Sequence, residues 1–312
     1  MASTARTTSC LYGITAVGML WLVAMLAAAA VAQEPQPQHW DRATASSLLS
    51  YIEQIGGQGL NPADYEPSQL RQAIDSADAA KRSKLTATLE RWRWFPHNPG
   101  GRYLIVNIPE YSLRLIDAGK EIESHKVIVG KPNLPTPQFS TEVTGVIFNP
   151  PWNVPQSIIR ESVGALVRGN PAGARSHGYA WTSVAGHLEV TQAPAPGNSL
   201  GQMKLDMPNP LRVYLHDTPG KALFDEPDRT FSHGCMRLQN PFDLAETLLA
   251  SAGWDRRRID AAVASRTTRR VALSTPLPVY VVYMTAVPQA DGSVLYLKDP
   301  YTQDAPVVAQ LN

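Results

Sequence analysis

The pattern of hydrophobic and polar positions changes along the chain and divides it into distinct segments. Residues 11–30 are almost entirely apolar. Residues 40–95 carry apolar side chains at helical spacing, as Leu48 and Ile52 do on one face. From residue 101 to 148, short runs of β-branched and aromatic residues alternate with turn residues, which is typical of strands. The pattern predicts an α+β chain in which a small helical module precedes a β-rich region.

Two helices of the module can be placed from the pattern. Leu70 and Ile74 mark a short helix after Pro67, and a second helix is expected to be capped by Ser83 and to bury Leu85. This module is predicted to support the region that follows it.

The β-rich region is expected to contain several short strands. Their predicted ranges are 103–108, 111–116, 121–129 and 142–148. A further strand over 211–215 would carry His216 at its end. Two helices are predicted after Asn240 and around 256–264, and residues 279–286 and 293–297 are predicted to pair as a terminal hairpin across Asp291-Gly292.

The stretch 153–205 is rich in Gly, Pro, Asn and Ser and is too long for an ordinary connection. It is predicted to be an insertion that acts as a lid. The resulting organisation is a signal peptide (1–32), a linker (33–39), a helical scaffold module (40–100), a catalytic domain (101–275, with the insertion) and a C-terminal β-hairpin extension (276–312).

The N-terminal apolar run has the features of a secretory signal peptide. Arg6 precedes it, and Ala30-Val31-Ala32 fits the small-x-small cleavage rule. The alternative is a retained membrane anchor, since the run approaches spanning length. The pattern favours cleavage and therefore export from the cytoplasm.

Charge excludes a nucleic-acid partner. Without Arg6 of the leader the chain has 27 basic and 27 acidic side chains. The run Arg256-Arg257-Arg258 is expected to be the solvated face of a helix.

Cys235 is the only cysteine outside the predicted leader, because Cys10 precedes the apolar run. A single free thiol in an exported protein invites a functional explanation, since oxidising compartments pair thiols. A buried inert cysteine is the alternative, but the neighbours Ser232, His233 and Gly234 suit a core strand poorly. The pattern favours a thiolate nucleophile.

A base and an oxyanion site can be assigned to this thiol. His216 lies nineteen positions before Cys235, and His233 lies two positions before it. Gly234 permits a tight turn, so that the amides of Gly234 and Cys235 could point at one oxygen. The helix after Asn240 could lower the thiol pKa through its N-terminus.

The segment from His216 to Asn240 resembles the signature of the L,D-transpeptidases, whose catalytic domain is of the YkuD type. The matching positions are His216, Ser232-His233-Gly234-Cys235, Arg237 and Asn240. Flanking similarity to the larger periplasmic members extends over about residues 60–298. The resemblance implies a β-rich catalytic domain with a mixed, sandwich-like core.

The resemblance also implies a reaction on peptidoglycan. Cys235 would attack the carbonyl of diaminopimelate in a tetrapeptide stem and release D-Ala. The amine of a second stem would then resolve the acyl-enzyme and form a 3→3 cross-link. The implied partners are this tetrapeptide donor and a diaminopimelate acceptor, with no cofactor and no metal, in the periplasm. The membrane would be contacted only through the leader.

The site residues receive roles from the same resemblance. His216 would accept and donate the proton, and the Asp217 carbonyl would orient its ring. Gly234 would supply an oxyanion amide, and His233 would support this region. The residues assigned to the substrate are Arg237, Asn240, Trp152 and Ser232. For Arg237 the alternative is a salt bridge with Asp243 or Glu246, and for Trp152 it is plain packing.

Rival interpretations remain open at the level of the sequence. His216, His233 and Cys235 could ligate zinc in a hydrolase, or the chain could be a non-catalytic wall-binding module. Within the transpeptidase interpretation, water or a lipoprotein lysine could replace the stem amine as acceptor. The first would make a carboxypeptidase or endopeptidase, and the second an anchoring enzyme.

Overall fold

The computed structural model describes residues 67–96 and 99–311. The predicted signal peptide, the linker 33–39 and the helical pattern before residue 67 lie outside these residues. Among the described residues, no helix has both the length and the apolar character needed to cross a bilayer.

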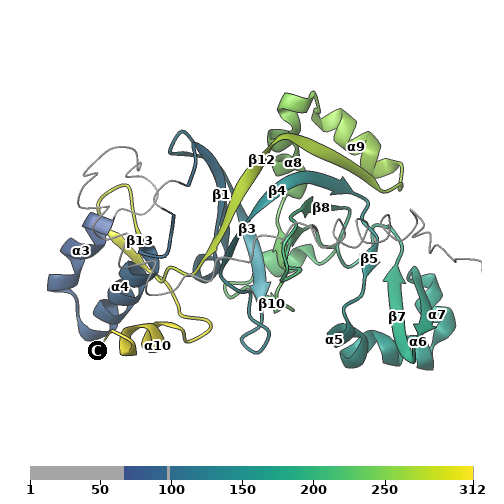
Figure 1. The fold of residues 1–312 in the computed structure, drawn as a ribbon, viewed down its shortest axis with the longest axis horizontal. Coiled ribbons are helices and arrows are strands. Elements are labelled where there is room, and N and C mark those ends of the chain that lie inside the picture. The colour runs from purple at the N-terminus through teal and green to yellow at the C-terminus, as the bar shows by residue number, and fades with distance from the viewer. Residues whose placement is uncertain (1–66, 97–98, 312) are drawn as a thin grey trace, which may run out of the picture. The chain divides into compact units, whose positions relative to one another are not determined.

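The central feature of the described chain is a nine-stranded mixed sheet (Figure 1). Its strands are β1 (Arg102–Asn107), β2 (Ser112–Asp117), β3 (Lys120–Gly130), β4 (Phe139–Phe148), β8 (Met203–Asp206), β9 (Leu215–His216), β10 (Thr230–Ser232), β11 (Met236–Leu238) and β12 (Arg269–Val282). The order is β10-β3-β11-β9-β8-β4-β12-β1-β2, and β2 pairs with β3 as well. The α+β, sheet-rich class is confirmed, and the extra pairing closes the sheet on itself.

Strand alternation explains why the sheet forms a core on both of its faces. On β1, Leu104 and Val106 join the main apolar cluster, whereas Tyr103 and Ile105 join a second cluster on the other side. Burying each such side chain contributes about 1.5–3 kcal/mol. β1 is therefore apolar at successive positions, as a strand covered on both sides must be.

Two helices follow β11 and pack on the sheet (Figure 1). α8 (Pro241–Leu249) buries Leu244 and Leu248, and α9 (Arg256–Ala264) buries Ile259. Both predicted helices are confirmed in position. Asn240, which precedes α8, adopts a left-handed conformation (φ 48°) and its side chain makes no capping bond.

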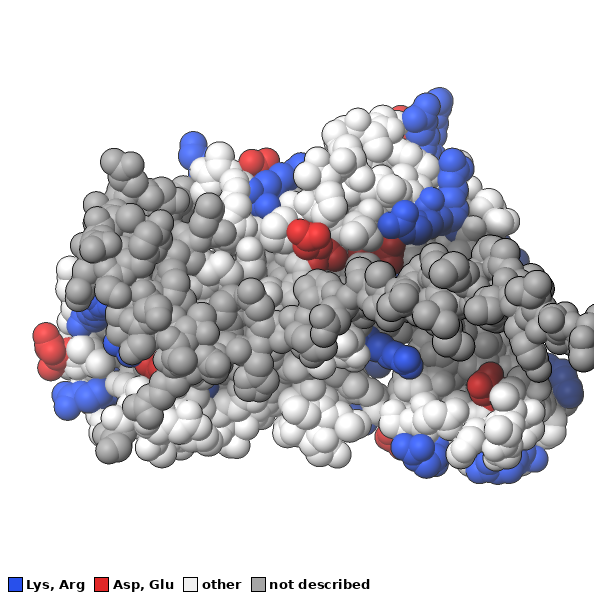
Figure 2. Space-filling view, viewed as in Figure 1, with Lys and Arg blue, Asp and Glu red and all other residues white. Residues whose placement is uncertain are grey.

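The arginines at the start of α9 are exposed, and basic side chains gather over this helix in Figure 2. Arg256 pairs with Asp243 at 2.7 Å and with Asp260 at 2.9 Å. The run is thus a solvated helix face with its own acidic partners, as the sequence predicts.

The described part of the N-terminal module consists of α3 (Pro67–Ser76) and α4 (Ala79–Trp92). The cap of α4 is Asp78, whose Oδ1 accepts a hydrogen bond from the Lys81 amide at 2.9 Å. The prediction of a cap at Ser83 is wrong by five residues, because the helix extends further towards the N-terminus than its apolar stripe.

The terminal hairpin is shorter than predicted. It consists of β13 (Ala286–Pro288) and β14 (Val294–Tyr296), and α10 (Asp304–Ala309) follows it. Residues 279–282 belong instead to β12, which pairs with β1 and β4. The predicted boundary at residue 275 therefore falls inside a central strand. A run of buried residues does not reveal which strand it will pair with.

The insertion has its own secondary structure and its own apolar cluster. β5 (Trp152–Asn153), β6 (Tyr179–Val184) and β7 (His187–Gln192) form a sheet in the order β5-β7-β6. Its helices are α5 (Gln156–Ile158), a π-helix (Ile159–Val163), α6 (Gly164–Gly169) and α7 (Pro171–Ser176). The cluster includes Val163, Val167 and Val190. The short 3₁₀ helices elsewhere are Ile108–Glu110, Lys221–Asp225 and Ala250–Ala252.

Candidate active site

Strand register brings the predicted catalytic residues together. β9 and β11 run parallel, with Leu215 opposite Met236 and His216 opposite Arg237. Leu215 and Met236 lie in the main core. Because side chains alternate, His216 and Arg237 occupy the opposite face. Cys235 directly precedes β11, so the two neighbouring strands present the thiol, the imidazole and the guanidinium in one region.

The strand that carries His216 is shorter than predicted. Only Leu215 and His216 are in β9, so the histidine lies within the strand and not after it. Asn209 holds the preceding segment as a turn, since its Nδ2 donates hydrogen bonds to the carbonyls of Met207 (2.7 Å) and Val213 (2.8 Å). Prolines at 208 and 210 lack the amide hydrogens that a longer ladder would need.

The His216 imidazole is buried, at 5% exposure, and is held in one orientation. Its Nδ1 is 2.5 Å from the carbonyl oxygen of Asp217, the contact expected from the sequence. Tyr214 packs edge-on against the ring at 5.8 Å. Burial and then the positive charge of Arg237 lower the pKa of His216 to about 4. The imidazole is therefore neutral at neutral pH, and the Asp217 carbonyl favours the proton on Nδ1, while a hydrogen bond to the Leu200 backbone acts to raise the pKa.

The Cys235 thiol is partly buried, and burial raises its pKa. Hydrogen bonding from Tyr214 and the charges of Lys204 and Arg237 act in the opposite direction. The Sγ atom lies 3.8 Å from the carbonyl oxygen of Arg212. The thiol is thus protonated at rest, and the groups around it favour the thiolate once it forms.

The turn before the thiol is built by Ser232. This side chain is 3% exposed; its Oγ donates to the Cys235 carbonyl and accepts from the Gly234 amide at 3.1 Å. Gly234 has φ +109°, a conformation that favours glycine. The Ser232 hydroxyl is used within the turn, so the structure supports a role in shaping the turn, and substrate binding by Ser232 stays a prediction.

The hydrogen bond from the Gly234 amide to Ser232 affects one of the two amides that were predicted to bind the oxyanion. The Gly234 amide is already engaged by Ser232. The Cys235 amide has no hydrogen-bond acceptor among residues 67–96 and 99–311. Of the two predicted donors, the Cys235 amide is the one open to a reacting oxygen.

His233 contacts the insertion. Its Nε2 lies 2.7 Å from Oε2 of Glu161 in the π-helix, and Lys131 approaches the same carboxylate at 4.0 Å. No group of three His, Cys, Asp or Glu side chains in the described ranges is arranged to hold a metal. The three ligands of the zinc interpretation are therefore not assembled.

Arg237 has no carboxylate partner in the part of the chain that the structure describes. The two suggested partners are occupied elsewhere: Asp243 pairs with Arg256, and Glu246 accepts from the Arg256 amide at 3.1 Å. The guanidinium is half-buried, and burial lowers its pKa. It therefore remains available to an anionic ligand.

Trp152 packs in an apolar cluster, whereas the exposed Asn240 is not contradicted as a substrate contact and stays a prediction. Trp152 is 7% exposed and belongs to the apolar cluster of the insertion, so the packing interpretation holds for it. Asn240 is exposed at the start of α8, and none of its side-chain atoms makes a hydrogen bond in the described structure.

The sequence interpretation missed Tyr214 and Lys204. The Lys204 ammonium lies 4.8 Å from the centre of the Tyr214 ring, and Lys204 is opposite His216 in the β8–β9 ladder. Tyr214 could have been found, because residues two apart on an extended segment share a face. Lys204 has no local signal, since only the fold brings β8 beside β9.

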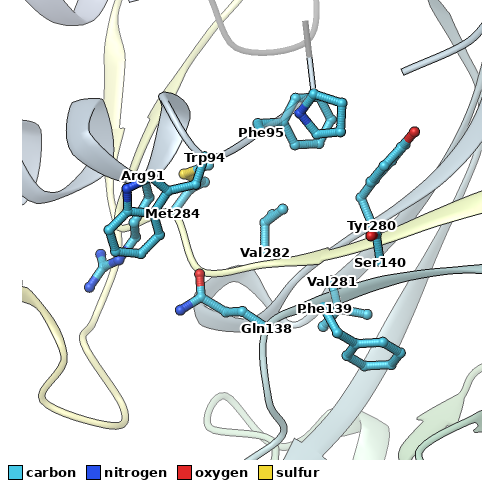
Figure 3. Close-up of a pocket in the computed structure, with 11 residues that line it drawn as sticks. Arg91, Trp94, Phe95, Gln138, Phe139, Ser140, Tyr280, Val281, Val282 and Met284 are labelled. Atoms are coloured by element: carbon cyan, nitrogen blue, oxygen red, sulfur yellow. The ribbon is translucent and has the colours of Figure 1, made fainter. Parts of the chain in front are cut away.

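A pocket of about 250 Å³ lies elsewhere, between the end of α4 and the ends of β4 and β12 (Figure 3). Trp94, Phe95, Gln138 and Tyr280 surround it. None of the predicted site residues lines it, so it is separate from the thiol.

Comparison with known proteins gives consistent results. The family model described as the L,D-transpeptidase catalytic domain, YkuD, matches residues 101–281. A curated protein of Haemophilus influenzae named "Putative L,D-transpeptidase" is 31% identical over 310 residues, which cover 90% of this chain and 61% of that protein. The chain thus spans about three fifths of the length of this relative.

Two solved structures are also similar. An L,D-transpeptidase from Mycobacterium smegmatis has 14% identity, 58% coverage of both chains and a TM-score of 0.31. L,D-transpeptidase 3 from Mycobacterium tuberculosis has 15% identity, coverage of 58% of this chain and 61% of that chain, and a TM-score of 0.31. Both TM-scores are low. The similarity of this chain to L,D-transpeptidases is therefore supported by the family model and by the curated relative, and not by these structures.

Proposed function

Since the chain belongs to the L,D-transpeptidase catalytic domain family, we propose that it is a cysteine acyltransferase that forms 3→3 cross-links in peptidoglycan. Cys235 is the nucleophile, and the donor is a tetrapeptide stem that ends in D-Ala. The acceptor is the side-chain amine of diaminopimelate in a second stem.

In the first half-reaction the thiol proton moves to Nε2 of His216 as Sγ bonds to the diaminopimelate carbonyl carbon. The carbonyl oxygen becomes an oxyanion, which the Cys235 amide stabilises. The C–N bond to D-Ala then breaks. His216 returns its proton to the leaving amine, and a thioester remains on Cys235.

In the second half-reaction the acceptor amine attacks the thioester carbonyl and gives its proton to His216. The C–S bond breaks, the new amide remains on the product, and the sulfur takes the proton back. The contact of Nδ1 with the Asp217 carbonyl keeps Nε2 as the atom that exchanges protons in both directions.

The charges of the site suit an acidic peptide. Lys204 and Arg237 both lower the pKa of the Cys235 thiol by their positive charge. Neither forms an ion pair with a carboxylate in the described ranges. Stem peptides carry several carboxylates, which these cations can bind, and Arg237 offers a planar fork for one of them.

One observation carries the proposal. A free thiol, a buried neutral imidazole and a buried turn with an open amide lie on adjacent strands within the region that matches the family. Such an arrangement suits acyl transfer through a thioester.

The test is muropeptide analysis of walls from cells that carry the Cys235→Ala variant in place of the natural protein. Loss of 3→3 dimers supports the proposal. Loss of a protein-linked stem would identify lipoprotein anchoring instead. Loss of tripeptide stems without a change in dimers would identify the hydrolytic alternative. Walls identical to those of the natural strain would contradict all three.

The proposed location is the periplasm, where the predicted signal peptide would deliver the enzyme to its substrate. Cell fractionation with detection of the chain in the periplasmic extract tests this, and recovery in the cytoplasm would contradict it.

A further inference from the structure

We propose that Thr136 and Tyr301 are positioning residues for the catalytic turn, and that they aim the Cys235 amide at the reacting oxygen. The inference rests on the proposed function, because it assigns these residues to the stabilisation of an acyl-transfer oxyanion. Neither residue belongs to the site predicted from the sequence.

The peptide unit between Gly234 and Cys235 is held by Thr136. The Thr136 hydroxyl donates a hydrogen bond to the Gly234 carbonyl at 2.8 Å, and Thr136 is 1% exposed. In a trans peptide the C=O and the following N–H lie in one plane and point in opposite directions. Fixing the Gly234 oxygen therefore fixes the direction of the Cys235 N–H, which points away from Thr136.

The direction of the Thr136 hydroxyl is itself determined. Its oxygen accepts a hydrogen bond from the Gly130 amide at 2.9 Å. Its single proton then remains for the Gly234 carbonyl. The site is also tightly packed, because a Cβ on Gly130 would lie 2.2 Å from the Leu134 carbonyl. The loop 130–136 therefore has no free space into which it could shift if the hydrogen bond between Thr136 and the Gly234 carbonyl were lost.

Tyr301 closes the same loop from outside it. Its hydroxyl donates to the Gly130 carbonyl at 2.7 Å and accepts from the Thr136 amide at 3.2 Å. Burial raises the pKa of this hydroxyl, so it keeps its proton and donates as described. The two ends of the loop are thereby joined by one phenol.

Tyr301 is in turn held by the C-terminal segment. Its amide donates to the Tyr283 hydroxyl at 2.8 Å, and that hydroxyl donates to Asp299. Both Asp299 and Tyr301 lie beyond residues 101–281, the range that matches the family. The residues after the matched domain thus contribute directly to the geometry of the catalytic turn.

The experiment compares two reactions of the same thiol. Acylation by a carbapenem passes through an oxyanion, whereas alkylation by iodoacetamide needs the thiolate but no oxyanion site. Both rates are measured by intact mass on the mature chain, across pH, with Cys235 as the only thiol. The variants are Thr136→Val, Thr136→Ser and Tyr301→Phe, and the control is Thr141→Val, which removes a hydroxyl bonded to the Pro208 carbonyl.

We expect Thr136→Val to slow acylation on the order of tenfold to hundredfold, with alkylation rate and pH profile unchanged. Thr136→Ser should restore acylation, Tyr301→Phe should slow it by about threefold to tenfold, and Thr141→Val should have no effect. Should Thr136→Val fail to fold, Tyr301→Phe and Thr136→Ser decide the matter.

Two results would overturn the inference: acylation at the natural rate in Thr136→Val or Tyr301→Phe, or a parallel loss of acylation and alkylation. The second would mean that the substitution only disorders the thiol. A natural protein that carbapenem does not acylate would instead refute the proposed function, and the inference with it, before any variant is compared.

Discussion

At Cys235 and His216, burial moves two pKa values apart. The pKa of the Cys235 thiol is above its ordinary value of about 8.5, and the pKa of the His216 imidazole is about 4. Proton transfer from thiol to imidazole at rest is therefore unfavourable, because both shifts oppose it. The site is thus a neutral pair that becomes charged only as substrate reacts.

The charge of Arg237 is predicted to tune both groups. Arg237→Gln removes a positive charge that lowers the pKa of His216 and of Cys235, so both values should rise. Iodoacetamide alkylation at pH 7 should slow on the order of threefold to tenfold, and the acid limb of acylation should move to higher pH. Arg237→Lys, which keeps the charge, should retain the natural profile. Identical profiles for the Gln variant and the natural protein would contradict this role.

His216 should also make stability depend on pH. Its folded pKa, about 4, lies below the unfolded value of about 6.5. The stabilisation is complete above pH 6.5 and is lost as the pH falls towards 4, because the unfolded chain binds the proton first. Between pH 7 and 4, the free energy of unfolding measured in urea should fall by roughly 3 kcal/mol more for the natural protein than for His216→Gln. Parallel curves for the two proteins would argue against a neutral buried imidazole.

For single residues, the sequence motif predicts which side chains belong to one region better than it predicts what each side chain contacts. The motif assigns His216 and Cys235 to one site, and the structure places His216 on β9 and Cys235 directly before the neighbouring β11. Ser232 and Trp152 were assigned to substrate because they lie near the motif or resemble a groove wall, yet both are buried. Exposure depends on packing between distant segments, and no local pattern reports it.

Among the elements, the junction between β4 and α9 depends on a single side chain. Asn149 is 2% exposed, and its Nδ2 contacts the carbonyls of Ala262 (2.9 Å), Val263 (3.1 Å) and Thr267 (3.3 Å). Its φ is 48°, a left-handed conformation. The amide group thus adds hydrogen bonds to carbonyls at the end of α9 and in the turn after it, where Ala262 also accepts from Ser265 Oγ and Val263 from the Arg266 amide.

Replacing this residue separates two contributions to stability. Asn149→Ala should lower the free energy of unfolding by about 2–4 kcal/mol, from the loss of buried hydrogen bonds and from left-handed strain. Asn149→Gly should cost about 1 kcal/mol less, because glycine relieves the strain. Denaturant unfolding measures both, and equal losses in the two variants would exclude the strain term.

Elements with strong local signals were predicted well. α9 has the predicted bounds, and the first three strands differ from prediction by one residue at each end. The predicted hairpin forms, but its first strand begins at Ala286 and not at 279, because β12 continues through Val279 into a central position between β1 and β4. The pairing of Leu104 with Val279, 175 residues apart, follows from the closed sheet, which local periodicity does not encode.

Across the described molecule, α4 and the C-terminal segment are joined by a buried ion pair. Arg91 Nη1 lies 2.6 Å from Asp304 Oδ1, and the Arg91 guanidinium stacks on Tyr283 at 4.8 Å. The side chains are 1% and 8% exposed. This pair anchors the segment that contains Tyr301, and so connects the helical module with the loop beneath the catalytic turn.

Breaking the pair should destabilise the whole described unit. Arg91→Met leaves Asp304 buried without its main partner and should cost about 3–5 kcal/mol in urea unfolding. The matched control is Arg256→Met, whose ion pair with Asp243 is exposed and should contribute less than about 1 kcal/mol. Similar losses in the two variants would contradict a special role for the buried pair.

The nucleophile itself can be tested with a single donor and no acceptor. Intact mass spectrometry of the mature protein mixed with tetrapeptide stem should show one adduct on Cys235, equal to the stem without D-Ala, and none in Cys235→Ala. An adduct at another residue, or release of D-Ala by the Cys235→Ala protein, would contradict the thioester mechanism.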